Sequence, residues 1–220
     1  MAKQNSVNNF VQELTVDPGS SGDSFVQFNI NATGEFRIGV DDDASDAFKI
    51  SQGSALGTND TFVMTAAGER TMPLQPAFLA LVATTIVNVT GDGTAYTVVY
   101  DTEVFDQGGD FDGTSTFTAP VTGKYRLEAC TTFSELTGSV TNGYLNMVTS
   151  NRGYFTQYGV GVSRDSVSNR APVYATSLCD MDATDTAVIS SQCVGITKVV
   201  DVFSAGATDP RTWFSGNLEV

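Results

Sequence analysis

Three clusters of aspartates are the groups in this sequence whose types and spacing could support chemistry. They are Asp41–Asp43 with Asp46, then Asp106, Asp110 and Asp112, and then Asp180, Asp182 and Asp185. Calcium binds about six to eight oxygen atoms, which a loop of spaced carboxylates and carbonyls can supply. None of the clusters follows the EF-hand order. Because aspartate is also a common turn residue, a role in turns without any metal is the alternative.

Histidine is absent from the 220 residues. Its absence removes the commonest general base, the commonest metal ligand and every Ser-His or Cys-His nucleophile pair. Cys130, Cys179 and Cys193 lie in apolar or β-branched runs without zinc-site spacing, so we expect buried free thiols. Paired carboxylates could also hydrolyse a host polysaccharide, but spikes that do so are usually long β-helices with far more residues. We predict that the protein is not an enzyme and, calcium apart, needs no cofactor.

The charge balance excludes several kinds of partner. The chain has 25 acidic and 11 basic residues, a net charge of −14 and a pI near 4.1. It has no cluster of Lys and Arg, so binding to nucleic acid and attraction to anionic membranes are not expected. The longest apolar run, Ala77–Val89, is interrupted by threonines and is too short to span a bilayer. The N-terminus lacks the apolar core of a cleaved signal peptide.

The most suggestive binding segment is residues 151–158, which contain Arg152, Tyr154 and Tyr158; Arg164 flanks the next loop. Arginine and tyrosine are favoured in recognition because they offer area and hydrogen bonds at modest entropic cost. Aromatic faces also stack on sugars. The alternative is that both tyrosines form one face of a strand whose Phe155 lies in the core.

The elements that must position these residues are strands. Only residues 7–14 have helical spacing, and the first 24 residues are predicted to be an attachment segment and a turn-rich linker. Residues 25–73 contain four short alternating segments, each with one apolar face, such as that of Val26, Phe28 and Ile30. This apolar side packs either on the following domain or against two other copies in a β-prism stem. We favour the prism.

Pro73 and Pro76 mark a boundary, after which strand-like segments recur at the spacing of a sandwich or jelly roll. A hairpin is expected at the turn 90–93, and another joins the strand that ends at Pro120 to the strand that begins at Gly123. The expected strands cover residues 77–83, 86–89, 95–106, 114–119, 123–135, 143–150, 154–162, 173–179, 186–196 and 212–219. We therefore predict an all-β chain with a jelly-roll domain over residues 74–220.

From Gln75 to Val220 the order of motifs resembles the trimeric head domains of the C1q/TNF-like family. The motifs are Pro76-Ala77-Phe78, the loop 107–112, Phe117-Thr118-Ala119-Pro120 followed by Gly123-Lys124-Tyr125, and the terminal Phe214-Ser215-Gly216-Asn217-Leu218. The match spans about two-thirds of the chain. No sharp motif matches the family over residues 137–171.

The resemblance implies a homotrimer. The aromatic residues of the head, of which Phe78, Tyr100, Trp213 and Phe214 are examples, could line the three-fold axis; the alternative for each is an ordinary core position. Some C1q-like heads hold calcium near the apex. This makes the loop of Asp106, Asp110 and Asp112 the strongest candidate among the acidic clusters.

Residues 45–58, 67–69 and 75–80 resemble the stretch that precedes such heads in phage tail-fibre proteins. The resemblance implies a virion fibre or spike, assembled in the host cytoplasm. Its N-terminal segment would bind other virion proteins, and its head would bind a glycan or protein of the host surface. The alternatives are a decoration, neck or collar protein without a receptor, a polysaccharide-degrading spike, and a secreted bacterial adhesin.

Overall fold

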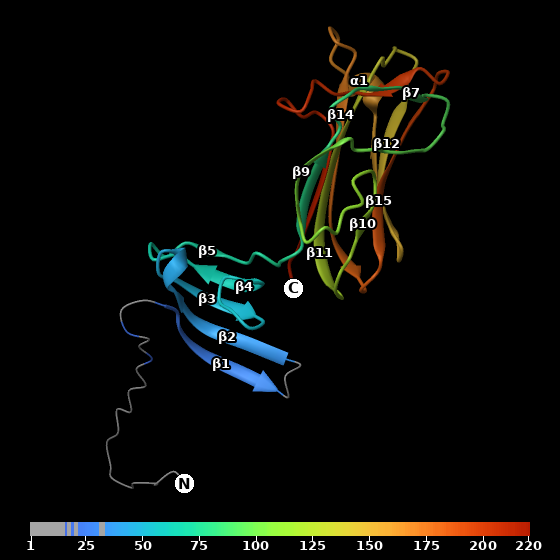
Figure 1. Cartoon of the computed structure of the whole chain (residues 1–220). Coiled ribbons are helices and arrows are strands. Elements are labelled where there is room, and N and C mark those ends of the chain that lie inside the picture. Colours follow the sequence, from blue (N-terminus) through green and yellow to red (C-terminus); the bar gives the residue numbers. More distant parts are fainter. Residues whose placement is uncertain (1–15, 17–18, 20–21, 31–33) are drawn as a thin grey trace, which may run out of the picture. The chain divides into compact units, whose positions relative to one another are not determined.

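The structure, a computed structural model, describes residues 22–30 and 34–220, together with Val16 and Gly19, and these are almost entirely β-structure (Figure 1). The chain divides into two compact units, Met1–Leu74 and Gln75–Val220. The helical turn expected over residues 7–14 and most of the attachment segment lie outside the described residues. Within the described part of the chain, no helix has the length and apolar character needed to cross a membrane.

The N-terminal unit is an antiparallel meander of five strands in the order of the sequence. The strands are β1 (Ser24–Ile30), β2 (Gly34–Asp41), β3 (Ala47–Gln52), β4 (Asp60–Met64) and β5 (Arg70–Thr71). A 3-10 turn, η1 (Asp42–Ala44), joins β2 to β3, and the Asp41 side chain accepts a hydrogen bond from the Ala44 N–H at its start. The four expected segments are therefore strands, and the short β5 was not expected.

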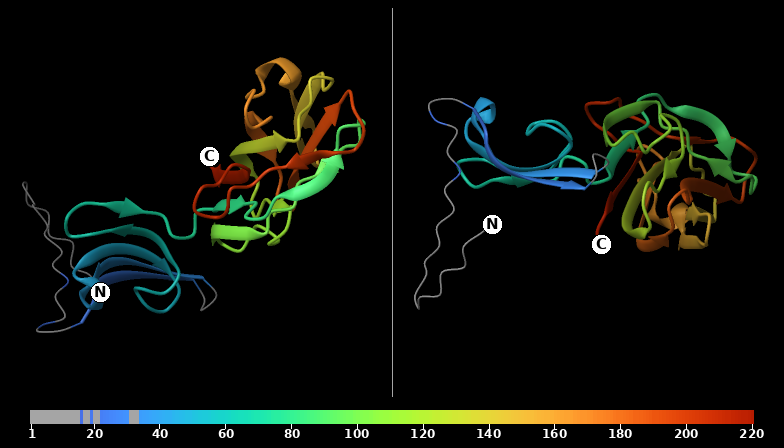
Figure 2. Two further views of the ribbon diagram at one scale, coloured as in Figure 1. Left: turned by 90° about the horizontal axis from the view of Figure 1, so that it is seen from above. Right: turned by 60° about the horizontal axis from the view of Figure 1, so that its bottom comes forward.

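The C-terminal unit consists of two β-sheets that face each other (Figures 1 and 2). The seven-stranded sheet has the order β7-β16-β11-β17-β6-β9, with β14 paired to β11. Its strands are β6 (Ala77–Leu81), β7 (Ile86–Thr90), β9 (Thr102–Gln107), β11 (Gly123–Ser134), β14 (Ala171–Met181), β16 (Val200–Val202) and β17 (Trp213–Leu218). The five-stranded sheet has the order β10-β15-β12-β13, with β8 paired to β15. Its strands are β8 (Tyr96–Thr97), β10 (Phe117–Thr118), β12 (Asn142–Thr149), β13 (Gly153–Tyr158) and β15 (Thr186–Val194).

Strands that are neighbours in space come from distant parts of the sequence. β6 pairs with β17, β12 with β15, and β11 with both β14 and β17. These antiparallel crossovers between two sheets define a jelly roll, so the predicted all-β jelly-roll class is confirmed. Alternating residues fill the core between the sheets, as Leu145 and Met147 do from β12.

The pairing differs from the expected hairpins. β7 pairs with β16 and β8 pairs with β15, so the turn at residues 90–93 does not join two paired strands. Likewise β10 pairs with β15 while β11 lies in the other sheet, so the two strands around Pro120 are not a hairpin. Both corrections have the same cause. In a jelly roll, consecutive strands often change sheets, and a tight turn serves as the crossing.

Three further boundaries differ from the expectation. The segment expected as one strand over residues 95–106 is divided into β8 and β9, because residues 98–101 leave the sheet. The segment 154–162 ends as a strand at Tyr158 and continues as the short helix α1 (Val160–Ser163). β16 was not expected, because its three residues are too few to show a pattern.

Candidate functional site

The outer face of the seven-stranded sheet is the most developed surface of the C-terminal unit. Backbone pairing aligns its outward residues in rows that cross β14, β11, β17 and β6. The rows are Tyr174–Cys130–Trp213–Leu81, Thr176–Glu128–Ser215–Leu79 and Leu178–Arg126–Asn217–Ala77. Phe105 of β9 extends the second row beside Leu79. Aromatic and aliphatic side chains therefore recur along all three rows of a face that points away from the core.

Several of these side chains are well exposed. The exposed fractions are 53% for Tyr174, 53% for Leu178 and 49% for Phe105. Large exposed apolar surface usually marks an interaction site, and on this sheet face the exposed apolar side chains lie towards both ends of the rows. The sequence carries one signal for it. β14 is apolar on both faces, with Val173 inside and Tyr174 outside, as strands buried on both sides are.

The face is hollowed in three places around Trp213. A hollow of about 420 Å³ is lined by Leu79, Leu81, Phe105, Glu128, Pro210, Trp213 and Ser215. A second, of about 350 Å³, lies between Trp213 and Tyr174, with Glu128 and Thr176 on its wall. The largest, of about 680 Å³, lies at the end of the face and is lined in part by Arg170, Phe203 and Arg211. Such hollows give the side chains of a protein partner a place to bind.

The loop 203–212 covers this end of the sheet. The Thr132 hydroxyl donates a hydrogen bond of 2.6 Å to the Arg211 carbonyl, and the Thr212 hydroxyl donates one of 2.8 Å to the Phe203 carbonyl. The Arg170 guanidinium lies 3.5 Å from the centre of the Phe203 ring. These contacts fix one wall of the largest hollow.

Few charges lie on this face. Arg126 pairs with Glu219 at 2.7 Å, and this contact raises the pKa of the arginine and lowers that of the carboxylate. Arg211 pairs with Asp209 at 2.7 Å at the edge. Both arginines are thus paired within the unit, whereas the Glu128 carboxylate in the middle row accepts a hydrogen bond of 3.4 Å from the Thr176 hydroxyl.

The structure corrects the expectation for three of the four predicted interface aromatics. Phe78, Tyr100 and Phe214 are at most 1% exposed, and they pack with Phe111 between the two sheets. Phe78 and Phe214 belong to the inward sets of β6 and β17, and Tyr100 lies in the segment between β8 and β9, so no surface of the unit presents the three side chains. Trp213, one residue before Phe214, points to the outer face and lines all three hollows. An interface role for Trp213 remains a prediction.

The four predicted ligand-binding residues do not form one surface. Arg152 pairs with Asp180 at 2.8 Å. Tyr154 and Tyr158 are half-buried residues of β13 that pack against the core, and Tyr158 also lines the hollow of about 350 Å³ beside Trp213 and Tyr174. Burial together with the neighbouring Cys179 raises the pKa of Tyr154. Arg164 donates hydrogen bonds to the Leu136 carbonyl and the Asn169 side chain. Each side chain is engaged with its own unit.

Phe155 is exposed, as are Gly153 and Gln157, so the part of the alternative that placed Phe155 in the core is wrong. It is 60% exposed, and its ring lies 5.2 Å from that of Tyr144 on β12. The alternation of β13 is as expected, but its inward set is the tyrosines. The outer face of the five-stranded sheet thus carries the exposed Phe155 ring beside the half-buried Tyr144 ring, with Asn146 and Gln157 next to them.

Two aspartates of the loop 106–112 accept hydrogen bonds from backbone N–H groups nearby in the sequence. The Asp106 carboxylate accepts hydrogen bonds from the Asp110 and Phe111 N–H groups. Asp112 accepts from the N–H groups of Thr114, Ser115 and Thr116. Burial would raise the pKa of Asp112, but these bonds hold it well below its ordinary value. Among the residues that the structure describes, no three acidic or sulfur side chains are arranged to hold a metal. The three carboxylates of the predicted calcium set therefore do not form such a group, and calcium binding by this loop stays a prediction.

The three cysteines are free and buried, as predicted. Burial raises the pKa of the Cys193 thiol to about 12, and burial also raises the pKa of Cys130 and Cys179. A thiol held in its protonated form is a poor nucleophile and a poor metal ligand. The cysteines are therefore part of the packing.

No protein-family model matches the chain, and no curated protein matches it. Among solved structures, it is similar to the globular domain of zebrafish complement 1qA, with 18% identity over 66% of this chain and 98% of that one, at a TM-score of 0.44. It is also similar to murine APRIL at pH 5.0, with 10% identity over 66% of this chain and 99% of that one, at a TM-score of 0.44.

Proposed function

We propose that this protein is a non-catalytic attachment protein, a trimeric component of a virion fibre or spike. Its Gln75–Val220 units would assemble through the outer face of the seven-stranded sheet, which we call the assembly face. The observation that carries the proposal is the set of exposed apolar side chains on this face, Tyr174, Leu178 and Phe105, beside the hollows around Trp213. The resemblance of the sequence motifs to trimeric heads supports the same assembly.

A closed ring of copies suits the shape of this face. It spans five strands from β14 to β9, with exposed apolar groups towards both ends and hollows between them. In a three-fold ring each copy offers one part of its face to one neighbour and another part to the next, so protrusions and hollows can meet without leaving an open end. Ring closure would also cover the exposed edge strands.

The face of the opposite sheet would then remain available to a receptor. Phe155 and Tyr144 form its aromatic pair, and Gln157 supplies an amide group beside them. Aromatic rings stack on sugar faces, and amides exchange hydrogen bonds with hydroxyl groups, so a host-surface glycan is the ligand we propose. Three such sites on one rigid head would gain avidity even if each bound weakly.

Assembly is tested by the double variant Tyr174→Glu/Leu178→Glu. Both residues are exposed, so the unit should still fold, while each copy places two added charges in the proposed interface. Sedimentation velocity should give three times the 23.3 kDa chain mass for the wild type and a monomer for the variant. Val167→Glu is the matched control, because Val167 is 89% exposed in the loop after α1, and it should remain trimeric. A monomeric wild type at micromolar concentration would overturn the proposal.

Attachment is tested separately with fluorescently labelled protein on susceptible host cells. The wild type should stain the cells, and Phe155→Ala/Tyr144→Ala should reduce staining at unchanged mass. Immunogold labelling of particles should place the protein on a fibre. Labelling of a collar or capsid, with no staining of cells, would instead show a decoration protein.

A further inference from the structure

The five-stranded sheet of the N-terminal unit has one face on which apolar side chains predominate from β1 to β4, with the polar Ser24 and Gln52 at its margins. In the observed register Val26 lies opposite Ile38, and Phe28 lies opposite Phe36. The next strands continue the face, with Val40 opposite Phe48 and Ile38 opposite Ile50. The face comprises Val26, Phe28, Ile30, Phe36, Ile38, Val40, Phe48, Ile50, Phe62 and Met64. We call it the apolar stem face.

These side chains are incompletely covered within their own unit. Ile30 is 71% exposed, Phe28 is 58% exposed and Phe36 is 46% exposed. A sheet with one fully apolar face is stable in water only when a second layer covers that face. Among the described residues of the unit, no second layer covers this face, because β1–β5 all belong to one sheet.

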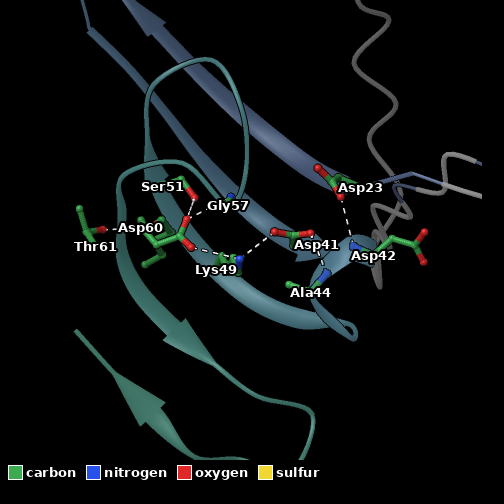
Figure 3. Close-up of polar contacts among 10 residues, drawn as sticks. Asp23, Asp41, Asp42, Ala44, Lys49, Ser51, Gly57, Asp60 and Thr61 are labelled. Carbon is green, nitrogen blue, oxygen red and sulfur yellow. Dashed lines mark hydrogen bonds and ion pairs between the residues drawn. The ribbon is translucent and has the colours of Figure 1, made fainter. Parts of the chain in front are cut away.

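The opposite face of the sheet carries the charged groups of the central strands and is covered in part by the loop of residues 53–59. The Lys49 amino group lies between Asp41, at 2.7 Å, and Asp60, at 3.1 Å, in a buried ion-pair cluster (Figure 3). Asp60 also accepts hydrogen bonds from the Ser51 hydroxyl and from the Gly57 N–H of the loop over this face. Desolvation of the amine acts to lower the pKa of Lys49. The hydrogen bonds to the Asp41 and Asp60 carboxylates outweigh it, so the pKa of Lys49 is raised. The charges of the sheet are thus gathered away from the apolar stem face.

We propose that the apolar stem face is a second interface between copies of this chain, at which three sheets close a three-sided stem. Its ten side chains include no charged group, whereas each chain carries a net charge of −14. Like-charged copies repel each other, and the repulsion between them is smallest where the facing surfaces carry no charge. Contact between two apolar faces also removes the largest apolar area from water.

Chain connectivity provides the second argument for this occupant. Only residues 72–76 separate β5 from β6, a distance of at most about 18 Å when fully extended. Heads that assemble as a trimer would therefore hold three stem sheets at a local concentration on the order of millimolar. The number of copies rests on the proposed function, but the pairing of apolar stem faces rests on this face alone.

Cysteine cross-linking of the full chain tests the inference. Ile38 is half-buried at the centre of the apolar stem face, and the native thiols are buried, so Ile38→Cys adds one thiol at the proposed axis. A short bismaleimide should convert most of this variant into covalent dimers on a denaturing gel. Gln27→Cys is the matched control, because Gln27 is exposed on the opposite face of the neighbouring strand, and it should give monomers.

The same experiment in the Tyr174→Glu/Leu178→Glu background separates the two proposals. Cross-links at Ile38→Cys that persist there, at raised protein concentration, would support the stem interface even if the heads do not assemble. The inference would be overturned if the wild type has a trimeric mass but the Ile38→Cys variant gives no more cross-links than the Gln27→Cys control. The proposed function would then still stand. That result would mean that the apolar stem face is covered by the chain's own C-terminal unit.

A second variant guards against loss of folding. Phe28→Lys places a charge in the proposed interface, whereas Gln27→Lys places it on the opposite face. In the Ile38→Cys background, Phe28→Lys should reduce cross-linking at least tenfold and Gln27→Lys should not. Equal cross-linking in the two would contradict the inference.

Discussion

The thiol groups offer the simplest test at the level of single residues. Burial raises the pKa of Cys193 to about 12, and it raises the pKa of Cys130 and Cys179 as well. Because only the thiolate reacts, a chromogenic disulfide reagent at pH 8 should detect almost no thiol in the native protein. In denaturant it should detect all three. Rapid reaction of one native thiol would show that its strand opens without global unfolding; Cys130, which lines the largest hollow, is the one to watch.

Asp112 is a turn residue whose charge stabilises the fold. Burial acts to raise its pKa, but three backbone N–H groups hold that pKa well below its ordinary value. Asp112→Ala should destabilise the head by about 1 kcal/mol, since the carboxylate is exposed and solvent screens part of the effect. Urea unfolding at pH 7 provides the measurement.

The pH dependence of the Asp112 effect has a defined sign. A carboxylate with a lower pKa in the folded state contributes stability above its unfolded value of 3.8, and this contribution is lost as the pH falls towards the folded value. The difference between the wild type and Asp112→Asn should therefore be largest at neutral pH and shrink below pH 3.8. A difference that stays constant on acidification would show that the stabilisation by the N–H bonds does not depend on the charge.

At the level of elements, Gly57 shows how the loop of residues 53–59 is fitted to the sheet. Gly57 has a φ of +80°, and a Cβ there would lie 2.8 Å from Asp41 Oδ2, inside the Lys49 cluster. Gly57→Ala should therefore disturb the ion pair in addition to straining the backbone. Gly68→Ala is the matched control, because Gly68 has a φ of +94° and no heavy atom within 4 Å of the added Cβ.

The expected result is a loss of about 1 kcal/mol for Gly68→Ala and at least twice that for Gly57→Ala, both in the unfolding of the N-terminal unit. Hydrogen exchange of β3 amides measures this unit separately from the head. Equal losses would mean that the cluster can shift to make room for the methyl group.

Elements were easier to predict than their partners. The alternation of β12 and β15 is a local property, so the sequence predicts both strands. Their neighbours depend on contacts across the whole domain, and both expected hairpins failed for that reason. The prediction of the interface residues was wrong for a similar reason. Trp213 and Phe214 are adjacent and equally aromatic, and only their register on β17 separates the surface from the core.

At the level of the whole molecule, the same pattern recurs in both units. Each has one sheet face with exposed apolar groups, the apolar stem face in one and the assembly face in the other. The sequence shows the first plainly, because four successive segments alternate in phase. The second is harder to see, because its apolar groups are scattered over β6, β9, β14 and β17 and are gathered only by the crossovers of the jelly roll.

The net charge of −14 per chain makes assembly sensitive to salt, in a direction that tests which forces hold the copies together. If apolar contacts provide the attraction and the remaining charges repel, screening should strengthen association. The screening length falls from about 30 Å at about 0.01 M salt to about 3 Å at about 1 M. The dissociation constant from sedimentation equilibrium should therefore fall several-fold over this range.

Val167→Lys and Val167→Glu form a matched pair at an exposed position. The lysine variant should associate more tightly than the glutamate variant at low salt, and the two should converge at high salt. Association that weakens as salt is added would instead assign the attraction to ion pairs between copies and contradict an apolar interface.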